Sequence, residues 1–372
     1  MKFGGTSMGD AACIRRAAEI VAATANEAPL VVVVSAMGGV TNRLIEAARS
    51  SSEGNMQRPD ELADALRKQH REAIEVLVTD GERRTQLAAE VEKIIDDVTG
   101  LCRGTALLRE LTPRTLDAIS SVGERLSARL LASALCELNL RSVAVEATEV
   151  IVTDHVSGRA EPLMIQTRER ASATLLPLIR AHSVPVVTGF IGATAEGMLT
   201  TLGRGGSDYS ATILAAALEA SEAIIWTDVD GVLTADPRLV AEARTLREIT
   251  YNEAAELAYF GAKVLHPKTL RPVSEAGIPV WIRNSFAPER PGTKITATGH
   301  PTARGVKAIT AISDVTLITV GGRGIVGLPG VAGKTFTAAA NAQANVLLIS
   351  QSSSENDICF IINSADAPRT VE

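Results

Sequence analysis

The sequence predicts an α/β fold, in which a mostly parallel open sheet is sandwiched by helices and is followed by a small α+β module. Short β-branched, apolar runs alternate with helical patterns over most of the 372 residues. Continuous apolar runs are typical of strands buried on both faces of a parallel sheet. The clearest runs span residues 30–35, 184–190, 222–228 and 278–284.

Helical patterns lie between these strands. Residues 10–28 carry apolar side chains at the spacing of one helix face, and Asp10 is the expected N-terminal cap. Residues 55–112 are highly charged and poor in strand formers. We therefore expect them to form a helical insertion or hairpin that packs beside the sheet in a structural role.

The apolar rhythm is lost over residues 287–304, which mix Pro, Gly and Thr. This segment is expected to be a linker or an edge of the sheet. We place a first domain at 1–290, a linker at 291–305 and a second domain at 306–372. The second domain is expected to have the order strand, helix, strand, strand, and to stop before the helix and strand that would complete a small α/β sandwich.

Composition and charge exclude several classes of protein. Aromatic residues make up 3% of the chain and the net charge is −6, which disfavours a nucleic-acid binder. The four cysteines form no CxxC pair, so neither a disulfide framework nor a zinc site is predicted. No apolar run reaches roughly 18 residues and no leader precedes the first motif, so we expect a cytoplasmic protein without a membrane span.

The stretch LTTLGRGGSDYSATILAAALEA, residues 199–220, is a candidate anion site. Its glycines allow close approach of the backbone, and Ser207 and Asp208 stand where a helix begins with its N–H groups free. Arg204 can bind a carboxylate or phosphate through two parallel hydrogen bonds. The alternative is a tight capped turn with a solvated arginine.

The opening MKFGGTS follows the same logic. Lys2 would end a strand, Gly4 and Gly5 would form the turn, and the hydroxyls and N–H groups that follow could bind a phosphate chain. A lysine there can neutralise a phosphoryl group during transfer. The alternative is a simple strand-to-helix turn.

Further segments place polar residues at strand ends or helix starts. SAMGGVTNRL, residues 35–44, is again a strand, a glycine turn and a helix. Glu124 begins a helix, where it either favours the helix N-terminus or meets a substrate ammonium group. Thr227 and Asp228 end a strand, and ligands of open α/β sheets bind at such ends. Lys263 is either a further cation of the site or a solvated helix lysine.

Two phosphate-loop signatures are set aside. The glycines of GGRGIVG, residues 321–327, have no acidic residue about 20 positions on to hold a ribose. GVAGKT, residues 330–335, lacks the first glycine of a Walker A motif and predicts a turn leading into a helix. Glycine turns at strand ends, two lysines, an arginine and several carboxylates, without a Walker lysine, favour phosphoryl transfer by positioning and charge neutralisation.

Taken in order, KFGGTS, VSAMGGVTN, SVGERLSARLL, TGFIG, GRGGSDYSA, WTDVDGV, DPR and KVLHP resemble the aspartate kinases, which have the amino acid kinase fold. The tail from residue 315 resembles the first ACT regulatory module of these enzymes, especially of the threonine-sensitive kinases often fused to homoserine dehydrogenase. The resemblance implies ATP-dependent phosphorylation of L-aspartate to 4-phospho-L-aspartate, the first step toward lysine, threonine and methionine.

The resemblance also implies roles for individual residues. Those expected to be catalytic are Lys2, Asp208 and Arg204. Those expected to bind aspartate are Thr41, Glu124, Phe190, Arg204 and Ser207. Those expected to surround ATP are Lys2, Gly4, Gly5, Ser35, Thr227, Asp228, Arg238, Lys263 and Val264. No protein motif for a metal is expected, because Mg would arrive with ATP. The aspartate carboxylate is already ionised at neutral pH and needs no general base.

In the ACT-like tail, Gln351 and Ile325 match positions expected to contact an effector, either threonine or lysine. ACT modules pair across subunits, which implies a homodimer or larger homo-oligomer, with neither nucleic acid nor membrane as a partner. Family members carry several residues before the lysine of KFGG, whereas Met1 alone precedes Lys2 here, which leaves open whether the first strand forms. One alternative is a catalytically impaired fragment, or a regulatory subunit that binds an amino acid without turnover. Another is a kinase for glutamate or acetylglutamate.

Overall fold

A computed structural model describes residues 1–261, 265–299, 305–321, 329–351 and 357–372. The chain divides into two compact units, Met1–Ile309 and Thr310–Glu372. Within the segment 291–305, which we expected to be a linker or an edge, Thr293–Thr296 form strand β10 of the main sheet. The sheet thus extends beyond residue 290.

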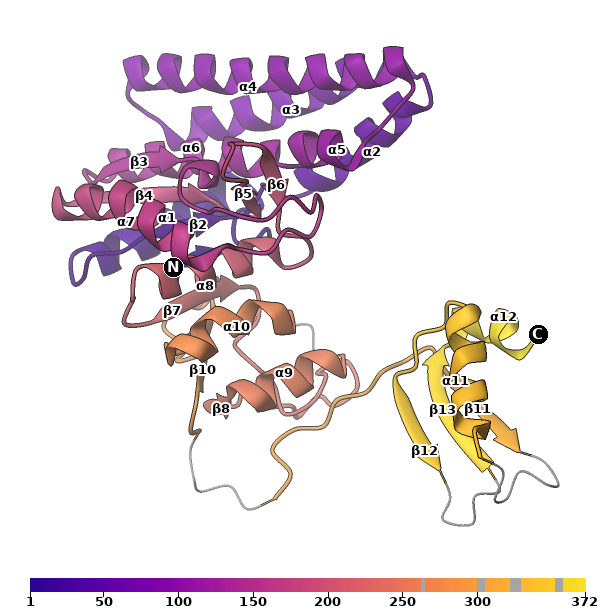
Figure 1. Ribbon diagram of the computed structural model, residues 1–372. Helices are drawn as coiled ribbons and strands as arrows, with labels where there is room; N and C mark the ends of the chain where they lie inside the picture. Colours follow the sequence, from indigo (N-terminus) through magenta and orange to yellow (C-terminus); the bar gives the residue numbers. More distant parts are fainter. Residues whose placement is uncertain (262–264, 300–304, 322–328, 352–356) are drawn as a thin grey trace. The chain divides into compact units, whose positions relative to one another are not determined.

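The first unit is built on an eight-stranded sheet with the order β3-β4-β2-β1-β7-β9-β10-β8 (Figure 1). The first six strands in this order run parallel, β10 is antiparallel to β9, and β8 is parallel to β10. This arrangement confirms the predicted mostly parallel α/β sheet. The strands of the sheet are β1 (Lys2–Phe3), β2 (Val32–Val34), β3 (Arg141–Val145), β4 (Ser183–Thr188), β7 (Ala223–Thr227), β8 (Glu248–Thr250), β9 (Val280–Asn284) and β10 (Thr293–Thr296). A separate antiparallel pair consists of β5 (Ile191–Ala193) and β6 (Leu199–Thr201).

Strand β1 is short but central. Lys2 is in register with Val33 on one side and Ile225 on the other, so both edges of the strand are hydrogen-bonded. The Phe3 ring stacks on the Trp226 ring with centroids 6.1 Å apart. The first strand therefore forms, and this removes the observation that motivated the regulatory-subunit alternative.

Helices cover both faces of the sheet (Figure 1). The strands are buried on both sides, as their apolar runs predicted: in β2, Val32 and Val34 belong to one hydrophobic cluster and Val33 to the other. The helices are α1 (Ala11–Ala25), α2 (Val40–Ser52), α3 (Arg58–Leu77), α4 (Gly81–Leu108), α5 (Pro113–Ser120), α6 (Val122–Glu137), α7 (Met164–Arg180), α8 (Gly206–Ala217), α9 (Tyr251–Tyr259) and α10 (Pro267–Ala276), with a 3-10 turn at Ala147–Glu149.

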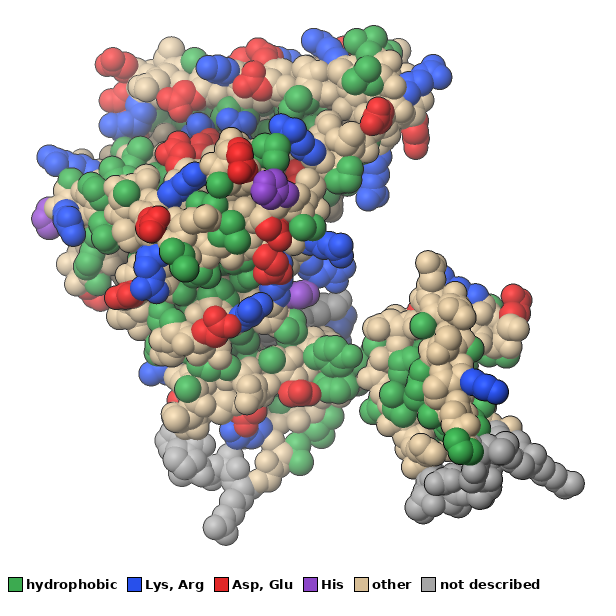
Figure 2. Space-filling model, viewed as in Figure 1, with side chains coloured by type: hydrophobic (Ala, Val, Ile, Leu, Met, Phe, Trp, Pro, Cys, Tyr) green, Lys and Arg blue, Asp and Glu red, His purple; other side chains and the backbone are tan. Residues whose placement is uncertain are grey.

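Two sequence-based expectations about helices are confirmed. The Asp10 carboxylate accepts a hydrogen bond from the Cys13 N–H at 2.8 Å and caps α1. The charged segment 55–112 contains α3 and α4, which pack on one another and on α2 and α6 as an outer layer. In this layer, basic and acidic side chains are interspersed on the face seen in Figure 2.

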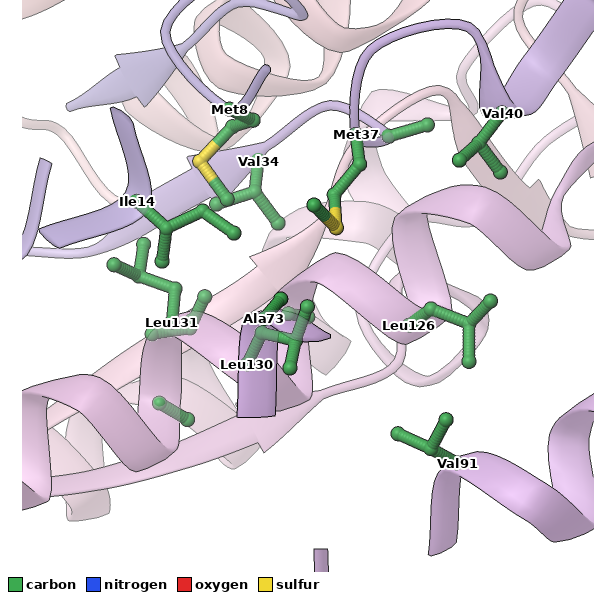
Figure 3. Close-up of a cluster of buried hydrophobic side chains, with 14 of the residues drawn as sticks. Met8, Ile14, Val34, Met37, Val40, Ala73, Val91, Leu126, Leu130 and Leu131 are labelled. Atoms are coloured by element: carbon green, nitrogen blue, oxygen red, sulfur yellow. The ribbon is translucent and has the colours of Figure 1, made fainter. Parts of the chain in front are cut away.

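The hydrophobic core anchors two loops that follow β1 and β2. Met8 and Met37, one from each loop, are buried in the same cluster as Leu126, Leu130 and Leu131 of α6 (Figure 3). Large apolar side chains fixed in a close-packed interior hold the attached backbone in place. The polar residues beside the two methionines are therefore presented from rigid loops.

The second unit has the predicted order of strand, helix, strand, strand. β11 (Val315–Gly321), β13 (Asp357–Asn363) and β12 (Leu348–Gln351) form an antiparallel sheet in that spatial order, and α11 (Val331–Asn341) begins after Gly330. Its small core includes Ala339, Phe360 and Ile362. After β13, a 3-10 turn at Ser364–Asp366 leads into α12 (Ala367–Val371), so the expectation of no further helix was wrong. Of the helices described, none is long and apolar enough to cross a membrane.

Candidate active site

A cavity of about 830 Å³ opens where the parallel strands end. The loops after β1, β2, β4 and β7 and the residue Phe286 beyond β9 contribute to its wall, the position at which open α/β sheets bind ligands. The lining residues are Lys2, Gly5, Thr6, Gly9, Ser35, Ala36, Met37, Gly38, Gly39, Thr41, Asn42, Glu124, Phe190, Gly203, Gly205, Gly206, Ser207, Asp208, Asp228 and Phe286. Nine residues that the sequence predicted for the site thus share one cavity: Lys2, Gly5, Ser35, Thr41, Glu124, Phe190, Ser207, Asp208 and Asp228.

Lys2 and Asp208 form an ion pair inside this cavity. The Lys2 Nζ lies 2.5 Å from Asp208 Oδ1, and the two side chains are 8% and 17% exposed. Lys2 is held by the central strand and Asp208 by the first turn of α8, so the pair joins sheet to helix. A carboxylate partner fixes the position of a cation that would otherwise be free to move on its long stem.

Glu124 is the most buried acid of the cavity, with the residue 4% exposed. Burial raises the pKa of its carboxyl to about 8, although hydrogen bonds from the Ala36 and Glu124 backbone N–H groups and the nearby Lys2 charge act in the opposite direction. Its Oε2 has no hydrogen-bond partner among the residues that the structure describes. Such an acid is poised to accept a positively charged group from a ligand, which would compensate its desolvation.

Two helices begin at the cavity without side-chain caps. Gly39 precedes α2 and Gly205 precedes α8, each with a left-handed backbone (φ 77° and 69°) that favours glycine. The first N–H group of each helix is used by the preceding turn: the Val40 N–H donates to the Met37 carbonyl at 3.1 Å and the Gly206 N–H to the Gly203 carbonyl at 2.9 Å. The N–H groups of the next two residues of each helix have no side-chain cap among the described residues and can bind ligand oxygens. Together with the helix dipoles, this makes the cavity suited to anions.

Phe190 lies in an unusual backbone conformation at the cavity wall. Its φ is 70°, a region that residues with side chains rarely adopt, and its N–H donates to the Ser210 hydroxyl at 2.9 Å. A Cβ on Gly206 would approach the Phe190 ring to 2.6 Å. The ring is thus packed directly on the first residue of α8, and strain of this kind clusters at ligand-binding sites.

Gly123 leaves room for the loop that follows β2. A Cβ there would lie 2.5 Å from the Ala36 Cβ, in the loop that carries Ser35. We expect Gly123→Ala to lower the free energy of unfolding by about 1–3 kcal/mol, because overpacking forces the backbone apart. Chemical denaturation measures this change.

The matched control is Gly104→Ala in α4, where an added Cβ meets nothing within 4 Å. That variant should be stabilised by about 0.5–1 kcal/mol, since alanine favours a helix interior. Equal effects of the two substitutions would contradict the packing argument.

Of the other residues that the sequence predicted for the site, some lie next to the cavity and others lie away from it. Arg204 is exposed between Gly203 and Gly205, both of which line the cavity. Gly4 lies beside the Lys2 side chain, since a Cβ added to this glycine would be 3.2 Å from the lysine Nζ. The Thr227 hydroxyl donates to Asp228 Oδ1 at 3.1 Å, next to the cavity.

Arg238 is not a lining residue: its exposed guanidinium binds the Asp236 carboxylate, with Nη2 2.6 Å from Oδ2. Lys263, Val264 and Ile325 lie outside the described residues. Gln351 is exposed at the end of β12, in the second unit. Among the described residues, no group of three or more His, Cys, Asp or Glu side chains could hold a metal ion.

Sequence reasoning missed several lining residues. Gly9, Gly38 and Gly39 could have been found from the glycine-rich motifs in which they stand. Asn42 could likewise have been found, because it stands in the SAMGGVTNRL segment next to Thr41. Phe286 carries no local signal, because its place at the cavity depends on the packing of distant elements. Behind the wall, the Ser7 and Ser285 hydroxyls lie 2.8 Å apart and connect the loop after β1 to the end of β9.

Comparison with known proteins agrees with this architecture. Residues 1–284 match the amino acid kinase family, and residues 318–372 match an ACT domain. Because the first match covers most of the chain, the protein belongs to the amino acid kinase family.

Its relatives include aspartokinases. The chain is 34% identical over 367 residues to bifunctional aspartokinase/homoserine dehydrogenase 1 of Arabidopsis thaliana, covering 97% of this chain and 40% of that protein. It is 40% identical over 295 residues to lysine-sensitive aspartokinase 3 of Escherichia coli, covering 79% and 63%. The chain thus spans about two fifths of the length of the bifunctional plant relatives.

A crystal structure of E. coli aspartokinase III in complex with aspartate and ADP superposes with a TM-score of 0.81 at 35% identity, over 98% of this chain and 78% of that one. The same enzyme in complex with lysine and aspartate gives a TM-score of 0.81 at 34% identity. The fold class expected from the sequence, an amino acid kinase fold followed by an ACT-like module, is therefore confirmed.

Proposed function

We propose that the protein is an aspartate kinase, which transfers the γ-phosphoryl group of ATP to the side-chain carboxylate of L-aspartate. The observation that carries this proposal is the meeting of the Lys2–Asp208 ion pair, the buried Glu124 and two uncapped helix N-termini in one cavity. A substrate with one ammonium and two carboxylates, beside a polyphosphate, matches these groups. The aspartokinase relatives support the same substrate.

In this reaction a side-chain carboxylate oxygen of aspartate forms a bond to the γ-phosphorus, while the bond from that phosphorus to the β,γ-bridging oxygen breaks. The products are 4-phospho-L-aspartate and ADP, and no proton is transferred because the attacking carboxylate is already ionised. The Lys2 ammonium would neutralise charge on the phosphoryl oxygens during transfer. Asp208 holds Lys2 in place, at 2.5 Å.

The substrate would be held by its charged ends. Glu124 would bind the ammonium group of aspartate, and Arg204 would swing over the cavity from its exposed position to bind the α-carboxylate with two hydrogen bonds. Thr41, Phe190 and Ser207 line the same cavity and would complete the aspartate site. Lysine could not replace Arg204 without loss of the bidentate geometry.

The phosphates of ATP would lie along the glycine turns after β1 and β2, where Gly5, Ser35 and Gly39 line the cavity. Gly4, Thr227, Arg238, Lys263 and Val264 are proposed to complete the nucleotide site. Kinases use Mg²⁺ to neutralise phosphate charge, and the exposed Asp228 carboxylate at the cavity edge has the oxygen ligands that this ion prefers.

The test is formation of aspartyl hydroxamate, in which hydroxylamine traps the acyl phosphate made from ATP and aspartate. We expect the wild-type chain to form it, and Arg204→Lys to raise the KM for aspartate about tenfold with the KM for ATP little changed. Arg168→Lys is the matched control, because Arg168 pairs with Glu219 at the surface, away from the cavity.

Preferential phosphorylation of glutamate or acetylglutamate would replace aspartate as the substrate. Absence of any acyl phosphate from a folded chain would contradict the proposed function.

We further propose that the second unit binds an amino acid effector and takes part in a homodimer or larger homo-oligomer. The ACT match over residues 318–372 supports this regulatory role. Two similar proteins are, respectively, lysine-sensitive and crystallised with lysine. Calorimetric titration with lysine and with threonine, repeated on Gln351→Ala, distinguishes the two effectors. We also propose that the protein works in the cytoplasm and catalyses the first step toward lysine, threonine and methionine.

A further inference from the structure

Asp117, a residue outside the cavity, has a buried carboxylate that accepts hydrogen bonds from two distant segments of the chain. It lies near the end of α5 and is 3% exposed. Its Oδ1 accepts from the Thr201 hydroxyl at 2.7 Å, and its Oδ2 accepts from the N–H groups of Gly158 and Thr201 at 3.0 and 3.3 Å. Burial raises the pKa of Asp117, whereas these hydrogen bonds lower it.

The hydrogen-bond partners of Asp117 adjoin the loop that carries Arg204. Thr201 is the last residue of β6, and Leu202, Gly203 and Arg204 follow it. The second partner, Gly158, packs on the same loop, because a Cβ on Gly203 would lie 2.8 Å from the Gly158 carbonyl oxygen. Asp117 therefore holds both the start of the Arg204 loop and the backbone on which that loop rests.

The segment 154–163 connects Thr201 to the first turn of α8. The Ala160 N–H donates to the Thr201 carbonyl at 2.9 Å, on the same residue that Asp117 binds. Glu161 accepts from the Tyr209 hydroxyl at 3.1 Å, next to Asp208 in α8. The segment is thus attached to both ends of the stretch from Thr201 to Tyr209 that contains Arg204, Ser207 and Asp208.

We propose that Asp117 is a positioning residue for aspartate binding, which acts by holding the Arg204 loop and the segment 154–163 in register. This inference rests on the proposed function. The carboxylate suits this position better than an amide. Asparagine could accept both N–H bonds with its amide oxygen, but the Thr201 hydroxyl would then have to accept from the NH₂ group instead of donating. The hydrogen bonds to a carboxylate would also be replaced by weaker neutral ones.

The experiment compares Asp117→Asn with Asp80→Asn. Asp80 is the control, since its Oδ1 also accepts a backbone N–H bond, from Arg83 at 2.8 Å, but it caps α4 and lines neither the cavity nor the segment 154–163, so its KM values should stay unchanged. We expect Asp117→Asn to raise the KM for aspartate about tenfold, with the KM for ATP changed less than about twofold. A purely structural role would lower the active fraction and leave both KM values unchanged.

A second pair of variants tests the same role if Asp117→Asn does not fold. Thr201→Val removes the hydroxyl that Asp117 accepts from and should raise the KM for aspartate, whereas Thr201→Ser keeps it and should not. Faster amide hydrogen exchange over residues 199–205 in Asp117→Asn would support the positioning role without using activity. A wild-type chain that neither binds nor phosphorylates aspartate would contradict the proposed function alone. Unchanged exchange and an unchanged KM for aspartate would overturn the role of Asp117.

Discussion

Replacement of Lys2 by methionine is expected to lower kcat about 100-fold or more, because one preorganised charge aimed at a developing anion contributes about that much. Methionine keeps most of the volume and the apolar stem of lysine, so β1 should still pair with β2 and β7. The loss should fall on kcat rather than on the KM for aspartate, since Lys2 is proposed to act on the transferring phosphoryl group. Hydroxamate formation at saturating substrates measures it.

The matched control is Lys307→Met. The Lys307 Nζ is also paired with a carboxylate, 2.6 Å from Glu253 Oε1, and its side chain is 24% exposed, but it contacts α9 rather than the cavity. Its kcat should stay within about twofold of wild type, as expected for a surface ion pair that contributes little. Comparable losses in both variants would assign the effect of Lys2 to folding, and full activity of Lys2→Met would remove it from the catalytic site.

The fold could be predicted from the sequence where local patterns decide structure. The apolar runs of β2, β4, β7 and β9 and the capped start of α1 carry their own signals, and these elements are where they were expected. The presence of strands β1 and β10 could not be predicted from local patterns. Each is too short to form by itself, and each exists because neighbouring strands supply its hydrogen bonds.

The same distinction, between local sequence signals and distant packing, applies to the residues of the candidate site. Glycine motifs and charged residues at strand ends identified nine residues of the cavity wall, because parallel strands bring their carboxyl ends together. Asp117 gave no such signal: its contact with Thr201 joins residues 84 positions apart and depends on the packing of α5 against β6. Nor does sequence indicate that Phe190 takes a positive φ, which the surrounding packing imposes.

Replacement of Glu124 by glutamine is expected to raise the KM for aspartate about 100-fold, because the ammonium group of the substrate would lose its buried counter-charge. The same variant should change the pH dependence of binding. Burial raises the pKa of Glu124 to about 8, so at pH 7 the carboxyl is mostly protonated before aspartate binds. An ammonium group stabilises the ionised form, and binding therefore releases nearly one proton.

The sign of the pH effect follows from this exchange of a proton for an ammonium group. Aspartate affinity should rise with pH from about 6 to 8 and level off above the pKa of Glu124, while Glu124→Gln should show no such rise. Calorimetry in buffers of different ionisation enthalpy counts the released proton directly.

Glu137→Gln is the control, because hydrogen bonds from Thr79 and the charge of Arg83 lower the pKa of Glu137 to about 2, so that this acid exchanges no proton near neutral pH. Proton release that persists in Glu124→Gln but disappears in Glu137→Gln would show that Glu124 does not receive the substrate ammonium group.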